Sequence, residues 1–256
     1  MRWRLLATPP LGAVENMAYD EALLARAAAT GEAVFRVYGW NEPTLSLGRN
    51  QPARHEYDES LLRRRGIAVV RRLTGGRAVL HDREVTYSVT APDAFGATLR
   101  EAYQRINEVL VAGLRRLGVD AAVAVPRGRS PVPSSAPCFE EPAGGELVVG
   151  DRKLAGSAQY REGGALLQHG SILVDDDQVI LASLLRTPCP PPPRVATLSA
   201  ALGRSPSLAE ATAALFAALR EREDTTATEL VADKSLRDAV SAAVARYRDP
   251  AWTWRR

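Results

Sequence analysis

Apolar and polar positions recur along this chain with two different periods, which predicts helices interleaved with strands. The clearest helical period covers residues 98–118, where apolar side chains recur every three to four positions until a glycine ends the pattern. Residues 15–29 predict a second helix, with Gly31 just beyond its end as a C-cap. Further Ala-rich helices are expected near residues 207–221 and 228–247.

Short runs rich in β-branched and aromatic residues predict strands at 33–38, 44–47, 67–72, 78–80, 85–89, 119–125, 147–149, 153–159 and 165–174. Residues 78–80 and 85–89 are expected to pair as one hairpin, and residues 147–149 and 153–159 as another. Helices that interleave with antiparallel hairpins indicate an α+β fold with mixed, mostly antiparallel sheets, rather than a parallel βαβ array.

Local signals mark a short helix and, further along, a change in the character of the chain. Asp58 is placed to cap a short helix that a glycine ends at position 66. Beyond Asp177 the strands give way to a short helix, a proline-rich link at 188–193 and the Ala-rich helices. We therefore expect a main unit at residues 1–186, and a link with C-terminal helices at 187–256 that packs on the same domain.

Composition narrows the class of protein. A chain of 256 residues with 46% hydrophobic and 25% charged residues is typical of a soluble globular domain. We expect a cytoplasmic protein, because no apolar run is long enough to span a membrane and two cysteines do not make a disulfide framework. The net charge of +3 mildly favours acidic partners, while no basic run with interleaved aromatics indicates nucleic acid.

Lysine is rare here, which draws attention to Lys153. Only two of the 33 Lys and Arg residues are lysines, and one of them follows Arg152 directly. An arginine cannot be deprotonated in a protein, whereas a buried lysine amine can exchange a proton near neutral pH. Composition alone leaves two equal alternatives, a solvated surface lysine and a functional amine.

The run from Arg71 to Asp82 turns through Gly75-Gly76 between two predicted strands. Paired glycines allow a close approach of backbone to a ligand, and the arginines beside them could bind a phosphate or carboxylate. The run is neither a Walker loop nor a dinucleotide fingerprint, because no helix follows the glycines. Taken alone, such a pair is more commonly an ordinary hairpin turn.

Cys138 lies after a proline in an irregular loop, a setting that suits a nucleophile held by a rigid scaffold. A nearby ammonium would lower the pKa of its thiol. Cys189, set among prolines, reads as inert. His81 and His169 share no metal-ligand spacing with the cysteines or with each other, which favours hydrogen-bonded structural histidines and no metal site.

Several ordered motifs between residues 12 and 175 carry a resemblance to a known family. They read GAVENMAYDEALL, PTLSLGRNQ, VVRRLTGGRAVLHDREVTYSV, CFEEP, ELVVGDRKLAGSAQ and GALLQHGSILVD. Together they resemble the biotin/lipoate protein ligase and octanoyltransferase superfamily, which implies a ligase-like catalytic domain over residues 1–186. One Gly-Gly pair would not support this resemblance, whereas six motifs in order do.

The position of the cysteine distinguishes branches of that superfamily. The widespread octanoyltransferases place their nucleophile in the segment that matches residues 165–171, which contains no cysteine here. Octanoyltransferases typical of Gram-positive bacteria carry a Cys-Phe-acidic motif about fifteen residues before the family lysine. Cys138-Phe139-Glu140 lies fifteen residues before Lys153. One departure is Ala143-Gly144-Gly145, where that group usually has a Ser-Trp-Tyr-like run.

The resemblance implies ping-pong transfer of an octanoyl group, with Cys138 and Lys153 as the catalytic residues. The donor would be octanoyl-acyl carrier protein, and the acceptor a lysine of a lipoyl domain or of the glycine cleavage H protein. We expect no nucleic acid or membrane partner, no metal, no cofactor and a monomer. The residues expected to bind substrate are Arg72, Thr74, Gly75, Gly76, Arg77, Ala78, His81, Gly156, Ser157, Ala158, His169 and Gly170.

Three alternatives stay open from the sequence. An ATP-dependent lipoate–protein ligase would use ATP as cosubstrate, and an amidotransferase would move octanoyl between two lipoyl proteins. A lipoyl-domain binding module without chemistry is the third, and Cys138 and Lys153 at the matched spacing argue against it.

Overall fold

The computed structural model describes residues 1–124, 145–187 and 193–255. Within these ranges the strands are β1 (Trp3–Ala7), β2 (Ala33–Tyr38), β3 (Thr44–Leu47), β4 (Ala68–Arg71), β5 (Val79–His81), β6 (Glu84–Pro92), β7 (Ala121–Val123), β8 (Leu147–Val149), β9 (Arg152–Glu162), β10 (Ala165–Leu173) and β11 (Thr228–Glu229). The helices are α1 (Ala13–Thr30), α2 (Glu59–Arg64), α3 (Leu99–Arg116), α4 (Leu181–Leu184), α5 (Leu198–Leu202), α6 (Leu208–Arg222), α7 (Lys234–Arg248) and α8 (Pro250–Thr253), with single 3₁₀ turns at Asp93–Phe95 and Gln178–Ile180.

The described strands form two sheets. The large sheet has the order β11-β1-β2-β6-β10-β9-β8-β7, and the small sheet has the order β4-β3-β5. From β2 to β7 all neighbours in the large sheet are antiparallel, whereas β1 pairs parallel with β2 and with β11. This arrangement confirms the predicted α+β fold with mixed, mostly antiparallel sheets.

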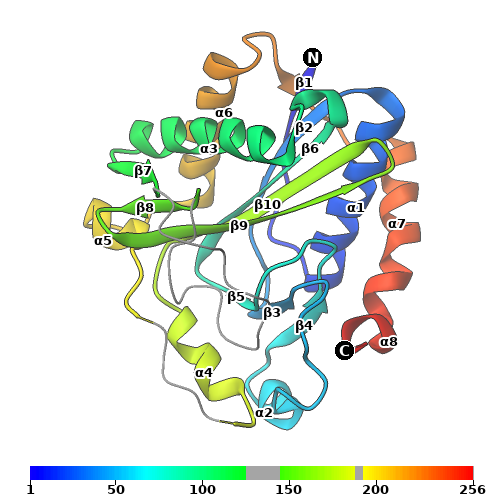
Figure 1. Ribbon diagram of the computed structural model, residues 1–256, viewed down its shortest axis with the longest axis vertical. Coiled ribbons are helices and arrows are strands. Elements are labelled where there is room, and N and C mark those ends of the chain that lie inside the picture. Colours follow the sequence, from blue (N-terminus) through cyan, green and yellow to red (C-terminus); the bar gives the residue numbers. More distant parts are fainter. Residues whose placement is uncertain (125–144, 188–192, 256) are drawn as a thin grey trace.

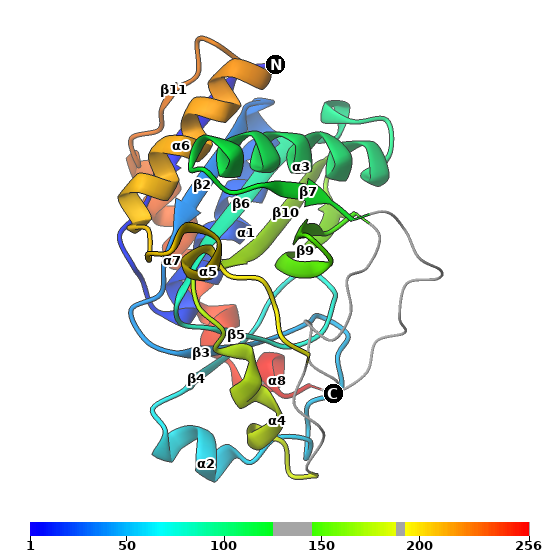
Figure 2. The same ribbon diagram turned by 90° about the vertical axis from the view of Figure 1, so that its left-hand side faces the viewer.

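Helices cover both faces of the large sheet (Figure 1). The pair α1 and α7 lies on one face, and the pair α3 and α6 lies on the other. Strands β6 and β10 are buried along nearly their whole length because both of their faces are covered. The view in Figure 2 shows the small sheet beside α2 and α4, which share an apolar cluster with it.

Capping residues lie at the ends of the helices where the sequence predicted them. Gly31 takes the left-handed conformation (φ 70°) at the end of α1, and its amide donates to the carbonyl oxygen of Ala27. At the start of α3, Thr98 and Glu101 form a reciprocal capping box. Asp58 accepts from the amide of Leu61 and so begins α2 as expected.

The predicted hairpin of residues 78–80 and 85–89 is wrong. The two strands exist, as β5 and β6, but they do not pair with each other. Strand β5 pairs with β3 in the small sheet, whereas β6 pairs with β2 and β10 in the large sheet. The turn between β5 and β6 therefore carries the chain from the small sheet to the large one, and residues of both sheets lie on either side of it. The predicted hairpin of β8 and β9 is confirmed.

Two further expectations need correction. The last long helix begins at Lys234 rather than at residue 228, because Asp233 caps it. Thr228 and Glu229 instead pair with β1, a strand that the sequence pattern did not reveal. The strand predicted at 119–125 is described only at Ala121–Val123, and the predicted 126–142 loop lies outside the described residues.

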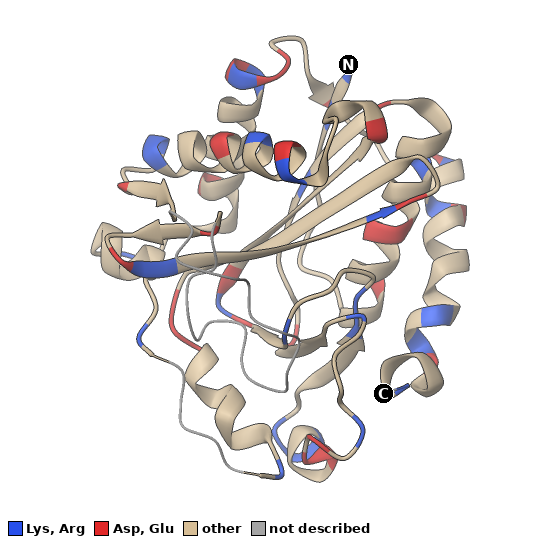
Figure 3. Cartoon of the chain, in the orientation of Figure 1, with Lys and Arg blue, Asp and Glu red and all other residues tan. Residues whose placement is uncertain are grey.

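The C-terminal helices pack on the rest of the chain. Helix α6 lies against α3, helix α7 lies against α1, and α8 lies beside β4. The division of the chain at residue 186 stays a prediction. Charged residues lie mostly on the helices and on the loops of the small sheet, while the central strands contain few (Figure 3). Among the described helices, none is both long and apolar enough to cross a membrane.

Candidate active site

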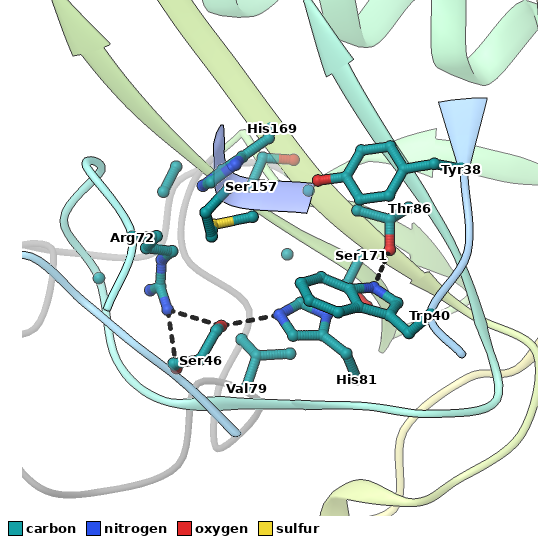
Figure 4. Close-up of a pocket in the computed structure, with 15 residues that line it drawn as sticks. Tyr38, Trp40, Ser46, Arg72, Val79, His81, Thr86, Ser157, His169 and Ser171 are labelled. Atoms are coloured by element: carbon teal, nitrogen blue, oxygen red, sulfur yellow. Dashed lines mark hydrogen bonds between the residues drawn. The ribbon is translucent and has the colours of Figure 1, made fainter. Parts of the chain in front are cut away.

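The described residues form a pocket where the large sheet faces the small one (Figure 4). Eight residues predicted to bind substrate line it: Arg72, Gly76, His81, Gly156, Ser157, Ala158, His169 and Gly170. Seven further residues line it that the sequence analysis did not single out: Met17, Tyr38, Trp40, Ser46, Val79, Thr86 and Ser171. Thr74, Gly75, Arg77 and Ala78 flank this lining within the same turn. The pocket thus brings together motifs from β5, β9, β10 and the Gly-Gly turn.

The Gly75-Gly76 turn needs a glycine at its second position. Gly76 has a φ of 89°, in the left-handed region, and a Cβ there would lie 2.9 Å from Nη2 of Arg72. Gly48 meets the same turn, because a Cβ on it would lie 1.9 Å from the carbonyl oxygen of Gly76. A side chain at either position would push the turn out of the pocket wall.

Arg72 holds this turn from inside. Its Nη2 donates to the carbonyl oxygens of Gly75 (2.8 Å) and Arg77 (2.7 Å). Its Nη1 donates to the carbonyl oxygen and the hydroxyl of Ser46, at 3.0 and 3.1 Å, and its Nε donates to the hydroxyl of Thr74 at 3.2 Å. A guanidinium carries five N–H donors, and these five acceptors match them.

Arg71 has a different surrounding from its neighbour. It is fully buried, and its guanidinium donates to the carbonyl oxygens of Gly48 (2.5 Å), Gln51 (2.9 Å) and Thr253 (2.8 Å). Arg71 does not line the pocket. The expectation that the arginines beside the glycines bind an anion therefore does not hold for Arg71, which instead ties a loop to the C-terminal α8.

The pocket residue His169 belongs to a buried network around Asp20 of α1. Its carboxylate accepts from Nδ1 of His169 (2.9 Å), Nη1 of Arg36 (3.0 Å) and the hydroxyl of Ser88 (2.8 Å). Burial alone would raise the pKa of Asp20, but the His169 hydrogen bond and the Arg36 charge outweigh it and lower that pKa. Burial lowers the pKa of His169, so this imidazole is neutral at pH 7.

A second buried network is centred on Glu84 of β6, which bonds to the pocket residues His81, Thr86 and Ser171. Its Oε1 lies 2.7 Å from Nδ1 of His81, and it also accepts from the hydroxyls of Thr86 and Ser171. Burial opposes ionisation, yet the charge and hydrogen bond of His81 lower the pKa of Glu84. The ring of Trp40 stacks on His81 with the centroids 4.2 Å apart. Both predicted histidines are thus hydrogen-bonded as expected, and both line the pocket.

A neutral polar cluster lies on the face of β10 that packs under α3. The hydroxyl of Tyr87 lies 2.7 Å from Oγ of Ser157 and accepts from Nε2 of Gln168 at 2.8 Å. Burial raises the pKa of Tyr87 to about 12, so its hydroxyl stays protonated. Gly170 lies between Tyr87 and Ser157 in the sheet register, and its missing side chain leaves room for both.

Lys153 is buried rather than solvated. Its side chain is 3% exposed, and Nζ lies 2.6 Å from Oε1 of Glu146, which is 9% exposed. Such a buried ion pair is uncommon for lysine and glutamate. The solvated alternative for Lys153 is therefore wrong, and its catalytic role stays a prediction. Cys138 and Cys189 lie outside the described residues.

Several of these groups were missed by the sequence analysis, although three of them carry a visible signal. Arg36 interrupts an otherwise apolar strand, and Asp20 sits among the alanines and leucines of a helix. Glu84 follows His81 by three residues across a turn. A charge within an apolar pattern indicates a buried partner. Among the described residues no cluster of three or more His, Cys, Asp or Glu could hold a metal ion.

Comparison with known proteins decides the family. The profile of the lipoyl protein ligase A/B catalytic domain matches residues 13–220, which is most of the chain. The chain belongs to the lipoyl protein ligase A/B family. Members of this family that are similar to it include the octanoyltransferase LipM of Kyrpidia tusciae, 50% identical over 195 residues, which are 73% of this chain and 71% of that protein.

A second relative spans almost the whole chain. The octanoyltransferase LipM of Symbiobacterium thermophilum is 39% identical over 272 aligned residues, covering 99% of this chain and 98% of that protein. These similarities confirm the superfamily that the motifs predicted, and they favour its octanoyltransferase branch.

Solved structures of the lipoyl protein ligase A/B family share the fold. A structure of the bi-partite lipoate protein ligase and its E2 lipoyl domain from Thermoplasma acidophilum matches with a TM-score of 0.80 at 24% identity, over 99% of this chain and 96% of that one. Lipoate-protein ligase A bound with ATP matches with a TM-score of 0.78 at 24% identity, over 99% of each chain. At this identity the likeness establishes the fold alone.

Proposed function

We propose that this chain is an octanoyltransferase of protein lipoylation, which moves octanoyl from acyl carrier protein to a lysine of a lipoyl domain or of the glycine cleavage H protein. The observation that carries the proposal is the similarity to octanoyltransferases at 39% identity over 99% of the chain. Cys138 is the nucleophile, and it lies fifteen residues before Lys153.

In the first half-reaction the Cys138 thiolate attacks the thioester carbonyl of the donor. A new C–S bond forms to the enzyme, the C–S bond to the carrier breaks, and the carrier sulfur takes a proton from the Lys153 ammonium to leave as a thiol. In the second half-reaction the acceptor amine attacks the thioacyl carbonyl. The neutral Lys153 accepts the amine proton, the amide forms, and the Cys138 thiolate returns.

The pair of Lys153 and Glu146 supports this role. A carboxylate 2.6 Å from Nζ fixes the position of the ammonium and offsets part of the cost of burying it. Arginine could not replace Lys153 in this scheme, because a guanidinium does not release its proton at neutral pH.

The Gly75-Gly76 turn supports the scheme as well. Among the described residues, no group accepts a hydrogen bond from the amides of Gly75 and Gly76. Backbone N–H groups that are fixed at a pocket edge can stabilise the oxyanion that forms when a thioester is attacked. Arg72 fixes the turn through the carbonyl oxygens of Gly75 and Arg77 and not through these amides.

Intact mass after incubation with octanoyl-acyl carrier protein, without ATP, tests the proposal. We expect an octanoyl adduct on the wild type and on Cys189→Ser, and none on Cys138→Ser. No adduct on any of the three, with modification of a lipoyl domain only after ATP and free lipoate are added, would replace the proposal with the ligase alternative. An adduct formed from an octanoylated lipoyl protein, but not from the carrier, would indicate the amidotransferase.

A further inference from the structure

Two buried carboxylates are connected to Arg72 by matching chains of hydrogen bonds. In the first chain, Asp20 bonds to Nδ1 of His169, and Nε2 of His169 lies 2.6 Å from the hydroxyl of Thr74, which accepts from Nε of Arg72. In the second chain, Glu84 bonds to Nδ1 of His81. Each chain is a carboxylate, a histidine and a hydroxyl in series.

The second chain continues from His81 to the same guanidinium. Nε2 of His81 lies 2.7 Å from Oγ of Ser46, and this oxygen accepts from Nη1 of Arg72 at 3.1 Å. Figure 4 shows Arg72, Ser46 and His81 in line along the pocket edge. The two chains therefore meet at one side chain, the first at Nε of Arg72 and the second at Nη1.

The chemistry of the groups sets the direction of the bonds. A carboxylate only accepts, so each histidine donates from Nδ1. The neutral imidazole of His169 then accepts the hydroxyl proton of Thr74 at Nε2, while Oγ of Ser46 accepts from Arg72 whichever way its bond to His81 runs. That leaves each hydroxyl oxygen as an acceptor, and the guanidinium only donates. Every bond in both chains is thus satisfied without a competing donor.

The remaining donors of Arg72 reach the turn. Its Nη2 bonds to the carbonyl oxygens of Gly75 and Arg77, and a side chain on Gly76 would collide with this nitrogen. Asp20 and Glu84 are each 8% exposed or less, and the hydrogen bonds of their carboxylates within the described residues go to groups outside the turn. Glu84 therefore acts on the turn through Arg72, and Asp20 acts on it through Thr74, which is bonded both to His169 and to Arg72.

We propose that Asp20 and Glu84 are positioning residues of the acyl-transfer site, which fix the Gly75-Gly76 turn through two carboxylate–histidine–hydroxyl chains that meet at Arg72. This inference rests on the proposed function for its catalytic consequence. It assigns Arg72 to the support of the turn rather than to the binding of a substrate anion, because all five of its donors are engaged within the protein.

The test uses Glu84→Gln, alone and combined with Arg72→Met, in the full chain. Glu84→Gln keeps the side-chain volume, and it lies on β6, away from the turn in sequence. The matched control is Thr90→Val on the same strand, whose buried hydroxyl has no partner among the described residues. If Glu84→Gln does not fold, Ser46→Ala breaks the same chain one step nearer to Arg72.

Two readouts separate this inference from the proposed function. The first is the position of the Gly75 and Gly76 amide resonances in NMR spectra, which needs no substrate. We expect both resonances to move in Glu84→Gln and to stay in place in Thr90→Val. Unmoved resonances in a folded Glu84→Gln protein would overturn the inference, whether or not the protein transfers octanoyl.

The second readout is the single-turnover rate of octanoyl transfer to Cys138, set beside the rate at which iodoacetamide alkylates it. We expect Glu84→Gln to slow acylation at least about tenfold and to leave alkylation unchanged, since the turn and not the thiol is altered. In the Arg72→Met background the same substitution should slow acylation less than about twofold. Equal losses in both backgrounds would overturn the inference. Failure of the wild type to be acylated would overturn the proposed function instead.

Discussion

The two faces of β10 are polar in different ways. The face toward α1 carries His169 and Ser171, which bond to the ionised carboxylates of Asp20 and Glu84. The face toward α3 carries Gln168 and the gap at Gly170, where neutral groups bond to one another. Charge therefore gathers on one side of a single strand, and close packing of neutral groups on the other. Removing a charge on the α1 face and filling the gap at Gly170 on the α3 face should therefore have different effects on stability.

The largest effect is expected from Arg36→Met, which removes the cation that pairs with Asp20. Both side chains are almost fully buried, so the substitution leaves a buried carboxylate without its ion-pair partner. We expect a loss of about 3–5 kcal/mol in the free energy of unfolding, measured by urea denaturation. Arg204→Met, which breaks an exposed pair with Glu210, should leave the urea midpoint unchanged. A small loss in Arg36→Met would show that charge on the α1 face is not what stabilises it.

A smaller loss is expected from Gly170→Ala on the opposite face. The added Cβ would lie 2.6 Å from Oγ of Ser157 and 2.7 Å from the carbonyl oxygen of Gly156, so the strands must shift. Overpacking of this kind costs about 1–3 kcal/mol. Gly39→Ala meets nothing nearer than 3.5 Å and should be nearly neutral in the same urea titration. Equal stability of the two variants would contradict the close packing of the α3 face.

Acidification should act through the α1 face. The pKa of His169 is lowered from 6.5, and those of Asp20 and Glu84 are lowered from 3.8 and 4.5. The unfolded chain therefore binds these protons at a higher pH than the folded chain does. Their contribution to stability is complete above the ordinary values and is lost as the pH falls through the folded values, by about 1.4 kcal/mol per pH unit for each proton.

Urea denaturation of the wild type and of His169→Gln at successive pH values checks this expectation. The wild type should lose stability more steeply than the variant as the pH falls below 6.5, because only the wild type carries His169, whose buried imidazole has a lowered pKa. Parallel curves would contradict the assigned neutral state of His169.

The last pair of variants compares one tyrosine hydroxyl on each face. Tyr38→Phe removes a donor to the Asp20 carboxylate (3.2 Å), and Tyr87→Phe removes a neutral hydroxyl that Ser157 and Gln168 share. Hydrogen bonds to charged groups contribute about 1.5–3 kcal/mol, and neutral ones about 1 kcal/mol. The loss in thermal stability should be larger for Tyr38→Phe. The reverse order would remove the distinction between the faces.

Features that depend on a few neighbouring residues could be predicted from the sequence. The ends of α1, α2 and α3 follow from Gly31, Asp58 and Thr98, since a cap acts within one turn of its own helix. The family motifs also predicted most of the pocket lining. These signals are local, or they are repeated in relatives, so no knowledge of distant contacts was needed.

Pairings between distant segments could not be predicted in the same way. Strand β5 is separated from β6 by only a turn, yet it pairs with β3, because the choice of partner depends on which sheet buries each strand. Strand β11 is two residues long and exists only through β1. Asp20 joins a histidine 149 positions away, and this contact has no counterpart in the sequence pattern.

Arg71 joins α8, near the end of the described chain, to the loop at Gly48 that packs against the Gly75-Gly76 turn. The Arg71 guanidinium donates to the carbonyl oxygen of Thr253 and also to the carbonyl oxygens of Gly48 and Gln51 in the loop. Trp252 in turn donates from its indole to the carbonyl oxygen of Arg71, so α8 and Arg71 are hydrogen-bonded in both directions. A label or partner protein fused after this helix should leave residues 250–255 intact. Their removal would break these hydrogen bonds and loosen the loop beside the pocket, some two hundred residues away in sequence.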